Sequence, residues 1–447
     1  MGSKKMIRLI AAVVLLLTLT ACSSGEDDPA GTTTEADAVQ TITTVTDMSD
    51  VSSISTSETS HSSVTKTSDK STKDSKGTTS VTNCLTTTST SASSMAAPNV
   101  AVGKQNLSNT AYKLKKEKKL TVGFIGGSVT VGTGASSSAN GWRMKTVEWL
   151  KSTYSADIEQ VNASMGGTGS YYGLMRADAN LLTGKPDLVF VEFAINDSYL
   201  NYSSSESARY MESLVRKCYQ SNPNMDIVFV YTTNQNKKGA MTNWIRAFNT
   251  VASHYGLITI DAGASMKEKI GTGNWADYYS DTSHPNDAGH DLIFQSVNQA
   301  IKSGIDEHNS ATALRQHDIP SVTREDLLLD TTMIHAADIA KTNTDVTVNA
   351  ATYEAPNGSL RLSAGQSMTV SFEGRTVGVY WDRASRYSNN VECVVDGRTT
   401  VTKNLCTSSS GSYQHILFDG LTSGTHTLTI TNKGSLPVKI NELFVSK

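Results

Sequence analysis

The chain has 447 residues, of which 39 are Lys or Arg and 42 are Asp or Glu, giving a formal net charge of −3. A mildly acidic balance argues against a nucleic-acid partner, because phosphate binding needs an excess of basic side chains. The five cysteines contain no Cys-x-x-Cys pair, so a zinc ribbon or a redox dithiol is unsupported.

Residues 1–21 have the form of a secretory signal. Three basic residues precede an apolar run from Leu9 to Ala21 that is too short to cross a bilayer as a helix. The run ends in Leu-Thr-Ala-Cys22, which resembles the lipobox of bacterial lipoproteins. The resemblance implies lipidation of Cys22, membrane anchoring at the bacterial cell surface, and a formal charge that falls from −3 to −6 when the three basic residues are removed. The alternative is an ordinary secretory signal cleaved near Ala21.

Residues 22–98 are expected to form a disordered tether. Ser and Thr dominate this stretch and aromatic residues are almost absent, so it contains too little apolar surface to fold. Attached to a lipid at Cys22, it would hold the folded part of the chain away from the membrane.

From residue 99 to residue 304, short apolar runs alternate with helical periodicity, a pattern typical of an α/β domain with a parallel sheet. Five strands are predicted, at Leu120–Ile125, Ile158–Ala163, Leu188–Ala194, Ile227–Thr232 and Leu257–Asp261. A helix is predicted between the third and fourth strands, where apolar residues recur at helical spacing from Ala208 to Cys218. The last helix is expected to begin after Asn286, which would cap it.

Residues 305–326 are expected to link this domain to a β-sandwich over residues 327–447. Apolar and polar residues alternate there between Asp-Gly and Lys-Gly turn signals. Predicted strands include Ser367–Phe372, Thr376–Trp381, Val391–Val395 and Thr425–Thr431. The spacing of Cys393 and Cys406 suits a disulfide in an oxidising compartment, although two buried thiols fit it equally well.

Three polar groups suggest a serine nucleophile. Ser128 follows the first predicted strand and a glycine pair, so it lies where α/β sheets bind ligands. Far downstream, Asp281-Thr-Ser-His284 supplies a carboxylate and a general base. The sequence around Ser128 lacks the second glycine of the Gly-x-Ser-x-Gly elbow and the glycine patterns of nucleotide sites. The α/β-hydrolase fold is therefore disfavoured, and no nucleotide cofactor is expected.

Four blocks together resemble the SGNH, or GDSL-type, hydrolase superfamily. In chain order they are Ile125-Gly-Gly-Ser128-Val-Thr130, Val161-Asn-Ala-Ser-Met-Gly-Gly167-Thr, Glu192-Phe-Ala-Ile-Asn196-Asp197 and Asp281-Thr-Ser-His284-Pro. Gly127 stands where the name-giving pattern has Asp, and Ala194 replaces the usual Gly. The resemblance covers residues 100 to 303 and implies a three-layer α/β/α, flavodoxin-like domain with a five-stranded parallel sheet.

The resemblance also implies a role for each polar residue. Ser128 would be the nucleophile, His284 the general base, and Asp281 the carboxylate that orients the imidazole. The oxyanion would be bound by the backbone N–H groups of Ser128 and Gly167 and by the side-chain amide of Asn196. No cofactor or metal is implied.

Acids and histidines recur every three residues at Asp281, His284, Asp287 and His290, which also suggests a metal site. Pro285 breaks this segment, so Asp287 and His290 are expected in the next helix, apart from the first two. Asp287 then fits a first-turn acid and His290 a structural residue, and no metal is expected.

Two groups of side chains are candidates for contact with the substrate, the first as lining of the cleft and the second as a face on which a sugar stacks. The two groups are Trp142, Tyr171, Tyr172 and Arg176 in the α/β domain, and Tyr380, Trp381, Asp382 and Tyr387 in the β-sandwich. Core packing is the alternative for the aromatic residues of the first group and for Tyr380 and Trp381 in the second. The β-sandwich resembles the accessory jelly rolls of carbohydrate esterases, which implies an esterase that removes acetyl groups from a polysaccharide. The alternatives are a lipase, lysophospholipase or thioesterase, or a noncatalytic carbohydrate-binding protein.

Overall fold

The computed structural model describes residues 100–101, 107–240, 242–353, 355–383, 390–404 and 411–447. The predicted signal peptide, Cys22 and the tether lie outside these ranges, as do Tyr387 and Cys406. Within them, no helix combines the length and the apolar character that a membrane span requires.

A six-stranded sheet forms the centre of the α/β part. In spatial order its strands are β1 (Val100–Ala101), β6 (Ile258–Asp261), β5 (Asp226–Tyr231), β4 (Leu188–Glu192), β2 (Lys119–Gly126) and β3 (Asp157–Asn162). Strands β2 to β6 are parallel, and β1 adds an antiparallel edge beside β6. The parallel strands follow the flavodoxin-like order 2-1-3-4-5, which confirms the predicted fold class.

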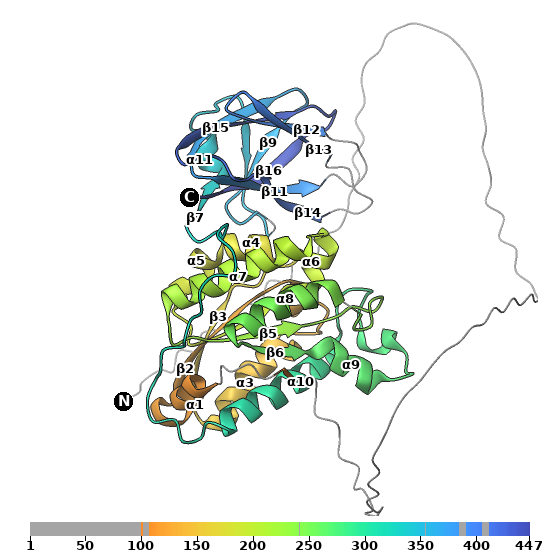
Figure 1. Cartoon of the computed structure of the whole chain (residues 1–447). Helices are drawn as coiled ribbons and strands as arrows, with labels where there is room; N and C mark the ends of the chain where they lie inside the picture. Colours follow the sequence, from red (N-terminus) through yellow and green to blue (C-terminus); the bar gives the residue numbers. More distant parts are fainter. Residues whose placement is uncertain (1–99, 102–106, 241, 354, 384–389, 405–410) are drawn as a thin grey trace, which may run out of the picture. The chain divides into compact units, whose positions relative to one another are not determined.

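Helices cover both faces of this sheet (Figure 1). One face carries α4 (Ser170–Met175), α7 (Ser204–Ser221) and α8 (Thr242–Tyr255), and the other carries α1 (Ser108–Tyr112), α3 (Trp142–Tyr154), α9 (Ala262–Ile270) and α10 (Asp287–Asp306). Alternate side chains of β4 enter opposite cores, Val189 on the α7 side and Phe190 on the α3 side. Burial on both faces explains why the sequence shows continuous apolar runs at these strands.

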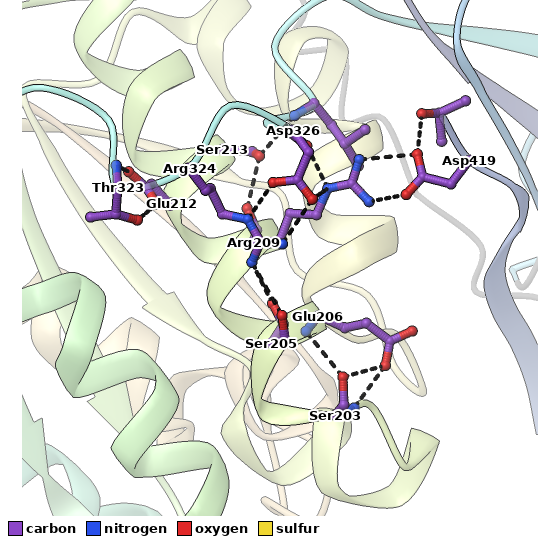
Figure 2. Close-up of polar contacts among 12 residues, drawn as sticks. Ser203, Ser205, Glu206, Arg209, Glu212, Ser213, Thr323, Arg324, Asp326 and Asp419 are labelled. Carbon is purple, nitrogen blue, oxygen red and sulfur yellow. Dashed lines mark hydrogen bonds and ion pairs between the residues drawn. The ribbon is translucent and has the colours of Figure 1, made fainter. Parts of the chain in front are cut away.

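The remaining helical segments are short. They are α2 (Ser128–Val131), α5 (Ala177–Asn180), α6 (Ala194–Leu200), a π-helical stretch Lys113–Glu117, and 3₁₀ turns at Ser138–Asn140, Leu182–Gly184 and Trp275–Tyr278. The predicted cap of α10 is confirmed, because Asn286 Oδ1 accepts a hydrogen bond from Gly289 N at 3.1 Å. Helix α7 begins with a reciprocal capping box between Ser203 and Glu206 (Figure 2).

The C-terminal part is a β-sandwich of two antiparallel sheets, as predicted. One sheet contains β10 (Ser367–Glu373), β15 (Thr425–Asn432), β12 (Asn390–Val395) and β13 (Thr399–Asn404). The other contains β14 (Gly411–Phe418), β11 (Thr376–Arg383), β16 (Val438–Ser446), β9 (Ser359–Leu362) and β8 (Thr347–Asn349), with β7 (Thr331–His335) paired to β16 and helix α11 (Ala336–Ala340) nearby. Alternating burial along β10 shows the half-buried pattern that the sequence indicated.

Cys393 lies in the core of this sandwich and forms no disulfide with another described cysteine. Burial raises the pKa of its thiol to about 12, so it stays protonated at neutral pH. Cys406 lies outside the described residues, and the disulfide between the two therefore remains a prediction.

The hydrophobic core on the α7 face continues into the β-sandwich. The ring of Tyr172, in α4, lies 4.3 Å from that of Tyr380 and 5.4 Å from that of Phe444 between centroids. Tyr171 packs edge-on against Phe444 at 5.8 Å, and Tyr172 Oη donates a hydrogen bond to Glu442 Oε2 at 3.0 Å. The two parts of the chain thus share buried aromatic side chains.

These contacts decide against substrate contact for most of the candidate side chains in both groups. Six of them are at most 4% exposed, namely Trp142, Tyr171, Tyr172, Arg176, Tyr380 and Trp381. Core packing is the correct assignment for these six. The side chain of Asp382 and all of Tyr387 lie outside what the structure describes.

Polar contacts on α7 also join the α/β part to the segment after α10 and to the sandwich (Figure 2). Arg209, whose side chain is 7% exposed, donates to the carbonyl of Asp326 at 2.5 Å and to both carboxylate oxygens of Asp419 at 2.5 and 3.2 Å. One turn further along, Glu212 accepts from Thr323 N at 2.7 Å. The C-terminal end of the predicted linker 305–326 therefore lies against α7.

Candidate active site

Ser128 is the first residue of α2 and directly follows β2 and the glycine pair. The N–H of Gly127 donates to the carbonyl of Glu192 at 3.2 Å, which fixes the turn to the end of the neighbouring strand β4. A Cβ atom at Gly127 would lie 2.2 Å from Asn196 Oδ1. Glycine therefore lets the side chain of Asn196 approach the turn that carries Ser128.

Ser128, His284 and Asp281 form one hydrogen-bonded series. His284 Nε2 lies 3.0 Å from Ser128 Oγ, and His284 Nδ1 lies 2.7 Å from Asp281 Oδ2. Asp281 Oδ1 also accepts from the N–H groups of Ser283 and His284 at 2.7 and 2.8 Å. Partial burial raises the pKa of Asp281, but these hydrogen bonds outweigh it and hold that pKa below its ordinary value. The carboxylate is therefore ionised at neutral pH and favours the tautomer with a proton on Nδ1.

The three predicted oxyanion donors lie on turns that adjoin Ser128. Gly167 is in the turn after β3, with a φ of +71° that favours glycine. A Cβ on its neighbour Gly166 would lie 3.6 Å from the Cβ of Ser128. Asn196 lies in the first turn of α6 and contacts Gly127 as described above. The structure thus brings all five predicted site residues together at the carboxyl edge of the sheet.

Two buried carboxyl groups support these turns, and sequence analysis gave them no role. Glu192 accepts from Thr130 Oγ1, in α2, and from Thr232 Oγ1, each at 2.8 Å. Burial raises its pKa to about 7. The sequence contains a signal for this role, because Glu192 is an acid at the end of an otherwise apolar strand. A buried carboxyl group needs hydrogen-bond partners, so such an acid is expected to bind neighbouring segments.

Asp197 is the second of these carboxyl groups. Its oxygens accept from Ser170 N at 2.8 Å, from Ser170 Oγ at 2.7 Å and from Ser207 Oγ at 2.7 Å. Burial raises its pKa to about 6. It joins the start of α4 to α6 and α7, and so supports the segment that follows Gly167.

Asp287 and His290 do not join Asp281 and His284. The Asp287 carboxylate accepts from Ser136 N and Oγ at 2.7 and 2.6 Å and from Asn140 Nδ2 at 2.9 Å. His290 is fully buried, with Nε2 3.1 Å from the carbonyl of Thr133. Both hold the segment that follows α2. Among the described residues, no group of three or more His, Cys, Asp or Glu side chains is arranged to hold a metal ion.

Two exposed tyrosines flank the site, and sequence analysis identified neither. Tyr199, in α6, is 51% exposed, and its Oη lies 3.1 Å from the Oγ of Ser283, the neighbour of His284. Tyr353, in the C-terminal part, is 60% exposed, and its Oη accepts from Gly166 N at 3.1 Å. No local pattern marks Tyr353, because its position depends on contact between the two parts of the chain.

Residues 124–292 match the model of the GDSL-like Lipase/Acylhydrolase family. The predicted resemblance to the GDSL-type hydrolases is thus confirmed over this segment. No curated protein sequence matches the chain significantly.

Solved structures extend the likeness of the fold beyond this domain. A two-domain esterase (CEX) active on acetylated mannans has 22% identity and a TM-score of 0.66, covering 77% of this chain and 97% of that chain. A structure of a two-domain esterase (CEX) active on acetylated mannans, co-crystallized with mannopentaose, has the same identity and the same TM-score. That match covers 77% of this chain and 96% of that chain. A variant of Axe2, an acetyl xylan esterase from Geobacillus stearothermophilus, has 22% identity and a TM-score of 0.36, covering 41% of this chain and 94% of that chain.

Proposed function

We propose that the protein is a serine esterase that removes O-acetyl groups from a polysaccharide. The observation that carries the proposal is the continuous series from Asp281 through His284 to Ser128, with distances of 2.7 and 3.0 Å. A hydroxyl, an imidazole and an ionised carboxylate in this order are the groups that activate a serine for attack on an ester.

In the proposed reaction, Ser128 Oγ attacks the ester carbonyl while His284 Nε2 takes the hydroxyl proton. The negative charge on the carbonyl oxygen is bound by the N–H groups of Ser128 and Gly167 and by the Asn196 amide. Collapse of this intermediate expels the sugar alcohol, which receives the proton from His284, and leaves an acetyl group on Ser128. Water then attacks the acyl-serine with His284 as base, which releases acetate and restores the serine.

A sugar polymer fits the surroundings of Ser128. The rings of Tyr199 and Tyr353 are exposed, and their hydroxyls lie beside Ser283 and Gly166 respectively, two residues that adjoin the proposed site. Such rings present an apolar face with a polar edge, which suits stacking against a pyranose. The two-domain esterase with the same fold is active on acetylated mannans, which supports the same substrate class here.

A lipid anchor at Cys22 and a tether over residues 22–98 would place this esterase on the outer surface of a bacterial membrane. That arrangement suits a polymer too large to import. The support is the basic, apolar and Cys-terminated pattern of residues 1–22 and the Ser- and Thr-rich composition that follows. Cys22→Ala is expected to abolish incorporation of labelled fatty acid and to release the protein into the medium. Retention of the label would contradict the assignment.

The central test is Ser128→Ala, assayed for acetate release from acetylated mannan and xylan. The hydroxyl contributes little to the core, so the variant should fold with an unchanged circular dichroism spectrum and lose all turnover. Ser138→Ala is the matched control, because Ser138 is an exposed serine in the following 3₁₀ turn and should retain activity. If Ser128→Ala kept the turnover of the wild-type protein, Ser128 would not be the nucleophile.

The choice between acetyl and longer acyl groups needs a second assay. Aryl esters from acetate to octanoate, tested on the wild-type protein, should show the highest kcat/KM for acetate. A rising series toward octanoate would favour a lipase or thioesterase. Failure of a fluorophosphonate to label Ser128 would favour the noncatalytic binding protein.

A further inference from the structure

The turn that carries Gly167 is held by side chains from the C-terminal part of the chain. Gln414, in β14, accepts from the N–H of Gly169 through Oε1 and donates to the carbonyl of Gly167 through Nε2, each at 3.0 Å. Tyr353 Oη accepts from the N–H of Gly166 at 3.1 Å. Three hydrogen bonds therefore connect this turn to the other part of the molecule.

Gln414 is itself fixed in place. It is fully buried, and its own carbonyl accepts from Tyr202 Oη at 2.7 Å. Both ends of its side-chain amide meet backbone groups of the turn, and this pairing defines the orientation of the amide. The far side of the turn is also closely packed, since a Cβ at Gly169 would lie 2.7 to 2.9 Å from Leu200, Asp197 and Tyr202.

These contacts surround the N–H of Gly167 without using it. Tyr353 holds the preceding amide, and Gln414 holds the carbonyl of Gly167 and the amide two residues later. The structure describes no hydrogen bond from Gly167 N to any described residue. A Cβ at Gly167 would meet nothing within 4 Å, so this position faces open space. The N–H is thus available to a ligand while both neighbouring peptides are fixed.

A glycine-rich turn is otherwise conformationally permissive, and a mobile donor stabilises an oxyanion less than a fixed one. We propose that Gln414 and the hydroxyl of Tyr353 are positioning residues, which hold the turn so that Gly167 N–H points at the developing oxyanion. The β-sandwich would then complete the active site of the α/β domain. The inference rests on the proposed esterase function.

The test compares Gln414→Ala and Tyr353→Phe in the full chain, with an aryl acetate as substrate. Gln414→Ala should lower kcat by roughly 10- to 100-fold, since a displaced oxyanion donor is lost in part. Tyr353→Phe should lower kcat by a few-fold, because one hydrogen bond to the turn is lost while the ring remains. KM should change little in both, and the pH profile should keep its shape because His284 and Asp281 are untouched.

Two control variants weaken the same contact between the two parts without touching the turn. Asp419→Asn disturbs the ion pair with Arg209, and Tyr172→Phe removes the hydrogen bond to Glu442. Both should lower the thermal midpoint and keep wild-type kcat. A loss of kcat in the controls as large as in Gln414→Ala would overturn the positioning role, because general loosening would then explain it.

If Gln414→Ala does not fold, the test still rests on Tyr353→Phe, because Tyr353 is exposed and its variant should fold. Replacement of its hydroxyl leaves the core intact, so unchanged kcat in Tyr353→Phe together with a folded, fully active Gln414→Glu would overturn the inference. Wild-type hydrolysis of the aryl acetate, absent in Ser128→Ala, would show that the proposed esterase function still stands. A wild-type protein that neither hydrolyses the ester nor reacts with a fluorophosphonate would overturn both.

Discussion

Asn196 and Gly127 show how two sequence blocks depend on each other at the scale of single residues. A Cβ at Gly127 would come within 2.2 Å of the Asn196 carboxamide, so the small residue in one block makes room for the amide in another. The family resemblance alone was enough to predict that both residues lie near the nucleophile. The physical reason for the glycine became visible only in the packing.

Asn196→Ala is expected to lower kcat on an aryl acetate by roughly two to three orders of magnitude, because it would remove one of the proposed oxyanion donors. KM should change much less. Asn236→Ala, at an exposed position, serves as the control and should behave like the wild type. A loss below about tenfold would assign the donor elsewhere and direct attention to the altered start of α6 at Ala194.

Glu192 is expected to make stability fall as pH rises. Its pKa is about 7 in the folded chain against an ordinary 4.5, so the neutral form is favoured by folding, and this stabilisation is full below pH 4.5 and lost as pH rises through about 7. The shift corresponds to about 3 kcal/mol. Urea titrations at about pH 5 and about pH 8 should therefore give a lower unfolding free energy at the higher pH.

Glu192→Gln should reduce this pH dependence, since the amide does not ionise. Glu148→Gln, at an exposed position of α3, should leave the dependence as it is in the wild type. An equal pH dependence in wild type and Glu192→Gln would show that other groups are responsible.

At the scale of elements, the start of α10 determines where His284 lies. Ser280 N donates to the carbonyl of His284 at 2.9 Å, and Asn286 N donates to that of Tyr278 at 3.0 Å, which closes the turn before the helix. The predicted cap at Asn286 and the break at Pro285 were readable from the sequence, because both are local signals. The use of Asp287 to hold Ser136 was not readable, because it depends on two segments meeting in space.

Asp287→Ala is expected to loosen the segment from residue 133 to residue 141. The change removes the acceptor of three hydrogen bonds, two from Ser136 and one from Asn140. Hydrogen exchange followed by mass spectrometry should show faster exchange in peptides from this segment, while those from β5 should be unchanged. Asp277→Ala, in the 3₁₀ turn at Trp275–Tyr278, is the control. Unchanged exchange in residues 133–141 would contradict the role given to Asp287.

At the scale of the whole molecule, sequence periodicity predicted both parts of the fold but not their contact. Alternating apolar and polar residues identify strands such as β10, and continuous apolar runs identify β4 and β5. Neither pattern reveals that Tyr172 and Tyr380 pack against each other, because each ring is an ordinary buried side chain in its own element. The side chains Gln414 and Tyr353 were missed for the same reason.

The shared aromatic core predicts that the α/β part and the sandwich unfold together. Thermal unfolding followed by near-UV circular dichroism and by loss of esterase activity should give one coincident transition. Arg209→Ala leaves the Asp419 carboxylate without its buried partner and should lower the midpoint of that transition. Two resolved transitions, with activity following only the first, would show that the parts unfold independently.

The two hydrogen bonds between Gln414 and the turn at Gly167 join residues that are 245 and 247 positions apart. Contacts of such sequence separation form late in folding, because a long loop must close before they gain any energy. During folding, the helices and the parallel sheet can therefore form before the turn is supported. Secondary structure alone would be a poor measure of maturation for this protein, since a chain can be largely folded before the turn at Gly167 is held in place.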